Sequence, residues 1–210
     1  MMCTIDRRRY AMQHASGSSG FKEVCSMPIL IGHASKGEDG FRKQKPGDQT
    51  GKEVCIRDWW DDEWNVLIRP ASKDMAEKMV KYCIQACAND NIGYDMKDRN
   101  TLHKELKKHN WDFTAVGPCE CDCSSLMVCC AIASGAKISY GFNAPVTSTM
   151  REVFEKTGQF EILTEARFLR GTEWIKPGDI LVSEGKHTVC VLGDDTRGDL
   201  DGVNLEACMR

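Results

Sequence analysis

The fold of this chain is decided by the stretch CECDCSSLMVCCAIASG, residues 119–135. The stretch begins polar, becomes almost wholly apolar at Leu126 and ends at Gly135. Glycine commonly follows the last turn of a helix, because it accepts a left-handed backbone without strain. We therefore predict a helix over about 124–134. A helix that is apolar on all sides is a core element, so we expect it to be buried.

Cys123 stands at the start of this helix and is the candidate nucleophile. A cysteine there faces unpaired backbone N–H groups and the positive end of the helix dipole, and both favour the nucleophilic thiolate. A buried structural cysteine is the plainer interpretation, and it fits the mid-helix residues Cys129 and Cys130. Cys123 instead lies between Asp122 and Ser124. We expect these two residues to support the helix start, with Asp122 accepting its N–H groups.

His187 is the candidate base. Residues 177–192 contain two short apolar runs on either side of a Ser-Glu-Gly-Lys turn, which predicts a hairpin whose second strand begins at His187. A cysteine at a helix start and a later histidine on a strand are arranged in this way in papain-like cysteine hydrolases. In those enzymes the two residues are distant in sequence and adjacent in the fold.

Two motifs carry a resemblance to a known family. The sequence DCSSL, residues 122–126, resembles the Asp-Cys-Ser-(Gly/Ser)-Leu nucleophile signature of NlpC-type cell-wall hydrolases. The sequence PGDIL, residues 177–181, followed by His187 and Thr188, resembles that family's Gly-Asp-(Ile/Leu) strand and catalytic histidine. The likeness spans about 27–193 and is greatest to the catalytic domains of phage endolysins from Gram-positive hosts.

The resemblance implies an α+β, papain-like fold, in which a central helix bearing the nucleophile packs on an antiparallel sheet. It implies a peptidoglycan hydrolase that cuts an amide bond through a cysteine thioester, with no cofactor and no metal. A muramoyl-L-alanine amidase and a stem-peptide endopeptidase both remain open. Such a protein is expected to be made in the cytoplasm without a signal peptide and to act on the cell wall after release.

The resemblance also suggests further site residues. The segment GYDM, residues 93–96, is similar to the one that carries the family's tyrosine, so Tyr94 is the candidate oxyanion donor. The family orients its histidine with a polar residue on the following strand, but no clear strand is predicted after Leu192. The third residue must therefore come from elsewhere. Candidates for this role or for the cleft are His33, Asp48, Gln49, Asp194 and Asp195.

Length and composition describe a single globular domain. The chain has 210 residues, a net charge of −3, 41% hydrophobic and 28% charged residues. Nothing in this balance suggests nucleic-acid binding, and no apolar run is long enough for a transmembrane helix. The twelve cysteines are scattered and lack an export signal, so we expect reduced thiols.

The domain organisation follows from where the patterns begin and end. We predict an N-terminal extension over 1–26, a catalytic domain over 27–193 and a tail or linker over 194–210. Short apolar runs predict strands at 29–31, 53–57, 65–69 and 160–163. Apolar residues that recur every three or four positions predict a helix from Ser72 to about 89, and a second, more polar helix is expected over about 99–109. The sequence does not indicate an oligomeric state.

Two alternatives to a hydrolase remain open. One alternative is a metal or redox site, because cysteines occupy alternate positions at Cys119, Cys121 and Cys123. Zinc sites, however, usually use cysteine pairs two to four residues apart together with a matching second pair. The other alternative is a non-catalytic wall-binding module. Its sugar-binding platform would be the tryptophans of the stretch DWWDDEW, which are Trp59, Trp60 and Trp64. The plainer interpretation of that stretch is a hairpin tip whose rings cover the sheet edge.

Overall fold

The computed structural model describes residues 28–36 and 45–194. Its strands are β1 (Ile29–Ala34), β2 (Val54–Asp58), β3 (Val66–Pro70), β4 (Ile92–Tyr94), β5 (Cys119–Cys121), β6 (Phe160–Leu163), β7 (Ile180–Ser183) and β8 (His187–Asp194). Its helices are α1 (Lys73–Ala88), α2 (Thr101–Lys108), α3 (Cys123–Ala133), α4 (Thr147–Glu155) and α5 (Ala166–Leu169). The predicted extension over 1–26 and the tail from residue 195 onward lie outside the described residues.

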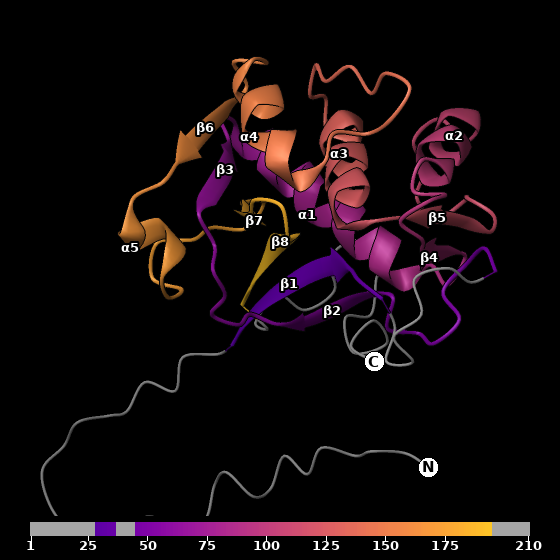
Figure 1. Cartoon of the computed structure of the whole chain (residues 1–210), viewed down its shortest axis with the longest axis horizontal. Coiled ribbons are helices and arrows are strands. Elements are labelled where there is room, and N and C mark those ends of the chain that lie inside the picture. Colours follow the sequence, from indigo (N-terminus) through magenta and orange to yellow (C-terminus); the bar gives the residue numbers. More distant parts are fainter. Residues whose placement is uncertain (1–27, 37–44, 195–210) are drawn as a thin grey trace, which may run out of the picture.

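Six strands form one sheet in the order β2-β1-β8-β7-β3-β6, and every neighbouring pair in it is antiparallel. The short strands β4 and β5 form a separate parallel pair. In Figure 1, α5 and α2 lie at opposite ends of the molecule, with the sheet and α3 between them. The predicted α+β class with an antiparallel sheet is confirmed.

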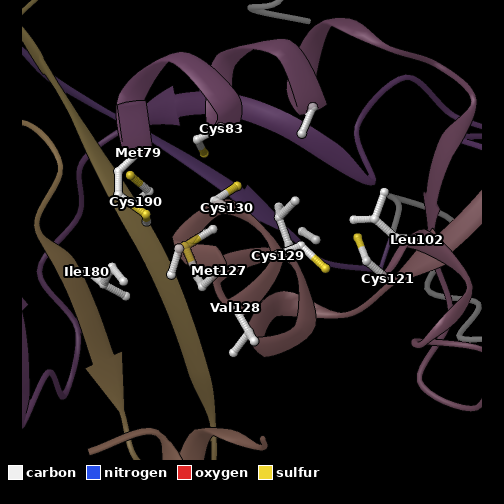
Figure 2. Close-up of a cluster of buried hydrophobic side chains, with 14 of the residues drawn as sticks. Met79, Cys83, Leu102, Cys121, Met127, Val128, Cys129, Cys130, Ile180 and Cys190 are labelled. Atoms are coloured by element: carbon white, nitrogen blue, oxygen red, sulfur yellow. The ribbon is translucent and has the colours of Figure 1, made fainter. Parts of the chain in front are cut away.

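Helix α3 packs on β8 and β1 and is the centre of the larger core. Nine of its eleven residues are buried, as its apolar surface predicts. Figure 2 shows the sulfurs of Cys83, Cys130 and Cys190 gathered between α1, α3 and β8. The nine cysteines that the structure describes are all free and buried. Each Leu, Met or Val side chain buried here contributes about 1.5–3 kcal/mol before entropy costs are counted.

Helix α1 approaches the sheet closely at Gly32 of β1. A Cβ atom at this position would lie 2.5 Å from the Cys83 sulfur, so only glycine leaves room for the helix. The helix begins as predicted at Ser72, whose side chain accepts the N–H of Met75. It ends at Asn89, also as predicted.

The opposite face of the sheet carries a second, smaller core. This core contains Ile31, Leu67 and Val191 from the strands, Trp64 from the β2–β3 connection and Phe168 from α5. Successive residues of a strand point to opposite faces, so the residues of β1 and β8 that face this core alternate with those that face α3.

The interpretation of residues 58–64 as a hairpin tip was wrong. Strands β2 and β3 do not pair, because β1, β8 and β7 lie between them in the sheet. The connection crosses the sheet and folds over its second face, where Trp64 is 1% exposed. Among the described residues, no helix combines the length and apolar character that a membrane crossing requires.

Candidate active site at the start of α3

The start of α3 is fixed by a reciprocal cap. The Asp122 side chain accepts the Ser125 N–H at 2.7 Å, and the Ser125 hydroxyl accepts the Asp122 N–H at 2.8 Å. This pattern satisfies two groups that an isolated helix end leaves unpaired. Cys123 is therefore the first residue of the helix, as the sequence predicted to within one residue.

Arg99 holds the cap in place, and the sequence analysis did not single it out. Its Nε donates to Asp122 Oδ2 at 2.6 Å, and its Nη2 donates to Asp122 Oδ1 at 3.0 Å and to the Ser124 hydroxyl at 2.7 Å. The same guanidinium donates to the carbonyl oxygens of Ala144 and Pro145. An arginine is suited to such a site because its planar fork matches a carboxylate in two places.

The Cys123 side chain lies against the strand that carries His187. The residue is 8% exposed, and the backbone N–H groups of Thr188 and Ser124 face its sulfur. Thr188 directly follows His187, so the backbone of β8 next to the candidate base passes beside the candidate nucleophile.

The Cys123 thiol is not activated in the way that the helix start alone suggests. Burial, followed by the charge of Asp122, raises its pKa to about 12, although the Thr188 and Ser124 N–H groups act in the opposite direction. Desolvation disfavours the charged thiolate more than the helix end favours it. The resting residue is therefore a neutral thiol, and it needs a base to become a nucleophile.

His187 has the properties of such a base. It lies at the beginning of β8, opposite Ser183 of β7, as the predicted hairpin requires. Burial lowers its pKa to about 4, while Asp62 raises and Arg57 lowers the pKa by smaller amounts. The imidazole is therefore neutral near pH 7 and able to accept a proton.

His33 contacts His187 directly. His33 Nδ1 lies 3.0 Å from His187 Nε2, and the two rings are nearly perpendicular, at 84°. The contact arises because β1 is the neighbour of β8 in the sheet. Burial, followed by the charge of His187, lowers the His33 pKa to about 3, so both imidazoles are neutral near pH 7.

The other candidates for the third residue lie in different settings. The Asp48 carboxylate accepts four backbone N–H groups of its own loop, from Thr50, Gly51, Glu53 and Val54. The Gln49 side chain donates to carbonyl oxygens of the same loop. Asp194 lies at the far end of β8, roughly 23 Å from His187 at the usual rise of a strand. Asp195 lies outside the described residues. Of this set, the structure brings only His33 to His187.

Tyr94 is placed near the nucleophile through the backbone of β4. It lies opposite Cys121 in the β4–β5 pair, two residues before Cys123. The next residue, Asp95, donates its N–H to the Cys121 carbonyl at 3.0 Å. Tyr94 is partly buried, so part of its side chain faces solvent.

The tryptophans do not form one exposed platform. Trp64 is buried in the second core, and its ring therefore presents no face to a sugar. Trp60 packs on both histidines, with its ring centre 5.5 Å from that of His33 and 6.1 Å from that of His187. Trp59 is partly buried against the same core. No local pattern predicted that Trp60 would cover the histidine pair.

The alternating cysteines show no metal-binding arrangement. Cys119 and Cys121 are buried in β5, where burial raises the pKa of each thiol. Within residues 28–36 and 45–194, no group of three or more His, Cys, Asp or Glu side chains could hold a metal ion. The geometry therefore gives no support to a metal site at Cys119, Cys121 and Cys123.

Two surface cavities lie away from the histidine pair. One of about 490 Å³ opens beside Arg69, Ser72 and Lys176, and another of about 330 Å³ opens beside Lys104 and Phe142. Neither is lined by Cys123 or His187.

Comparison with protein families supports the motif-based expectation. The model of the endolysin-like domain matches residues 31–198, which is most of the chain. The chain belongs to this family. Comparisons with curated proteins and with solved structures gave no match. Membership of the endolysin-like family indicates a lytic function on peptidoglycan, and the match includes both Cys123 and the histidine pair.

Proposed function

We propose that this endolysin-like chain is an NlpC-type hydrolase that cuts an amide bond of peptidoglycan through a thioester on Cys123. One observation carries the proposal: the α3 start presents a cysteine against the strand whose first residue, His187, is paired with His33. A thiol, a neutral imidazole and an orienting partner are the components of a cysteine hydrolase.

In the first half of the reaction, His187 takes the Cys123 thiol proton as the sulfur attacks the amide carbonyl carbon. The tetrahedral intermediate collapses with cleavage of the C–N bond, and protonated His187 gives its proton to the leaving amine. In the second half, water attacks the thioester carbon and gives a proton to His187. Cleavage of the C–S bond then releases the carboxylic acid, and the proton returns to the sulfur.

The oxyanion of each tetrahedral intermediate needs hydrogen-bond donors. Backbone N–H groups at the start of α3 and the Tyr94 hydroxyl are the proposed donors. One such donor typically lowers the barrier by roughly 3–4 kcal/mol. We assign Tyr94 this role from the family motif and from the position of β4 beside β5.

The proposed substrate bond is either the amide between muramic acid and L-alanine or a γ-D-glutamyl bond in the stem peptide. The proposed setting is release from the cytoplasm onto the wall of a Gram-positive host. The two alternative functions have less support. Trp64 is buried, Trp60 covers the histidines, and Cys119 and Cys121 have no metal-binding partners among the described residues.

The test is turbidity loss of purified Gram-positive cell walls with the wild type, Cys123→Ala and Cys123→Ser. We expect only the wild type to clear the walls, with release of new amino groups and no new reducing ends. Mass spectrometry of the fragments then identifies the bond. Lys78→Ala, on the exposed face of α1, is the matched control and should retain activity. Full lytic activity in Cys123→Ala would disprove the thioester mechanism.

A further inference from the structure

Cys55 lies behind the histidine pair and has no part in the chemistry described above. It is opposite His33 in the β1–β2 register and is 1% exposed. Its sulfur lies 3.6 Å from His33 Nε2, on the side of the ring away from His187. Both ring nitrogens of His33 are therefore engaged, one by Cys55 and one by His187.

The direction of the hydrogen bonds follows from which groups can donate. The Cys55 thiol has one proton, and the Lys52 carbonyl oxygen, 3.4 Å from the sulfur, can only accept it. The charge of Arg57 also acts on this thiol and lowers its pKa against the larger effect of burial. With the Cys55 proton directed to the Lys52 carbonyl, the sulfur is left to accept a hydrogen bond. In this arrangement His33 Nε2, 3.6 Å away, carries the proton that the sulfur accepts.

We propose that Cys55 is a positioning residue that fixes the tautomers of His33 and His187. With its proton on Nε2, His33 has a bare Nδ1 that accepts the Nε2–H of His187 at 3.0 Å. His187 then carries its single proton on Nε2 and keeps Nδ1 bare. A bare nitrogen is the one that can take the Cys123 proton, so this inference rests on the proposed function.

The opposite arrangement would block the reaction. If the Cys55 thiol donated to His33 Nε2, His33 would donate from Nδ1 to His187 Nε2. His187 would then carry its proton on Nδ1 and would have no free nitrogen for Cys123. The interaction between Lys52 and Cys55 selects against this state. The choice matters because both imidazoles are neutral near pH 7, so each has one proton to place.

The test compares Cys55→Ser, Cys55→Ala and Cys55→Val. A serine hydroxyl can donate to Lys52 and accept from His33, whereas alanine and valine can do neither. Valine fills the space of the thiol, so it keeps the test valid if alanine destabilises the fold. Long-range ¹H–¹⁵N correlation NMR of the histidines at pH 7 identifies which ring nitrogen carries the proton.

We expect His33 and His187 to be Nε2–H tautomers in the wild type and in Cys55→Ser, and mixtures in Cys55→Ala and Cys55→Val. Wall-hydrolysis kcat should fall about tenfold in the alanine and valine variants with KM unchanged, as expected for one lost hydrogen bond. Cys55→Ser should restore kcat. A wild-type His33 with its proton on Nδ1, or unchanged tautomers in both apolar variants, would overturn the proposal.

The NMR result separates this proposal from the proposed function, because it needs no substrate. If the tautomers respond to Cys55 as described but neither wild type nor variants act on walls, the positioning role stands and the proposed reaction fails. If walls are hydrolysed through Cys123 while the tautomers ignore Cys55, the reaction stands and the positioning role fails.

Discussion

His33 and His187 are 154 residues apart in sequence, and their ring nitrogens lie 3.0 Å apart in the structure. The pair forms because β1, the first strand that the structure describes, lies beside β8, the last one that it describes. The polar partner of the histidine therefore comes from the N-terminal strand. In the proposed reaction, His33 takes the place of the polar residue that the family carries on a further strand after the histidine strand.

Substitution of His33 should slow the chemical step while leaving substrate binding unchanged. We expect His33→Ala to lower kcat by about 10- to 100-fold, because His187 loses its orienting partner. This loss is a part of the rate enhancement of about 10²- to 10⁴-fold that a positioned base typically provides. Kinetics of wall hydrolysis measure this effect. His103→Ala is the matched control, since His103 stacks on Tyr140 and is not in contact with the pair. Equal losses in both variants would indicate a general effect of removing a histidine.

The activity should depend on pH through His187. Its pKa is lowered from 6.5 to about 4, so His187 is a competent base above this value and is protonated below it. We expect kcat/KM to rise with pH through about 4 and to be flat from about pH 5 to 8. A pH–rate profile measures the midpoint.

Two neighbours of His187 test that assignment in opposite directions. Asp62 raises the His187 pKa, so Asp62→Asn should move the midpoint of the pH–rate profile to lower pH. Arg57 lowers the His187 pKa, so Arg57→Gln should move this midpoint to higher pH. A midpoint near 6.5 that neither variant moves would contradict His187 as the base.

Glu120 should make the fold less stable as the pH rises. Its Oε1 accepts the Gly47 N–H at 3.0 Å, and its buried Oε2 has no hydrogen-bond partner among the described residues. Burial, with smaller contributions from Glu53 and Asp95, raises its pKa from 4.5 to about 8. The folded state therefore holds a proton that the unfolded state releases, and stability falls between about pH 4.5 and 8.

Glu120→Gln isolates this effect, because glutamine keeps the acceptor for Gly47 and cannot ionise. Urea unfolding should give the variant a higher midpoint than the wild type at pH 8, and the difference should shrink toward pH 4.5. Glu77→Gln, at an exposed position on α1, is the control and should not change the pH dependence. Parallel pH profiles for wild type and Glu120→Gln would contradict the raised pKa.

Local sequence patterns predicted the elements that position the nucleophile. The apolar run before Gly135 predicted α3, and the short apolar runs around the Ser-Glu-Gly-Lys turn predicted the β7–β8 hairpin. Both depend on contacts between residues close in sequence. His33 was one of several candidates until the β1–β8 pairing, which no local pattern encodes, placed it beside His187.

The predictions that were wrong or missing all depend on contacts between segments that are distant in sequence. Strands β2 and β3 are neighbours in sequence, which suggested a hairpin, but three other strands separate them in the sheet. The raised pKa of Cys123 depends on burial by distant segments, whereas the helix-end effect used in the sequence analysis is local. Arg99 gave no signal because its partner Asp122 is 23 residues away and its role depends on the fold.

The Arg99–Asp122 pair should be the most sensitive electrostatic contact of the site. Both residues are buried, and the guanidinium also holds the Ser124 hydroxyl and two carbonyl oxygens. Arg99→Ala would leave the Asp122 carboxylate buried without its counter-charge. We expect the free energy of unfolding to fall by about 3–5 kcal/mol, because breaking a buried ion pair on one side carries that cost.

Urea unfolding monitored by far-UV circular dichroism measures the loss. Lys78→Ala removes an ion pair of similar length with Asp74, but this pair is exposed on α1 and should have little effect on the free energy of unfolding. Cys123 should also react faster with iodoacetamide in Arg99→Ala, because a loosened cap exposes the first turn of α3. Surface substitutions typically change the free energy of unfolding by no more than about 0.5 kcal/mol. A fall of less than about 1 kcal/mol in Arg99→Ala would therefore be close to a surface effect, and it would show that Asp122 holds the helix start without Arg99.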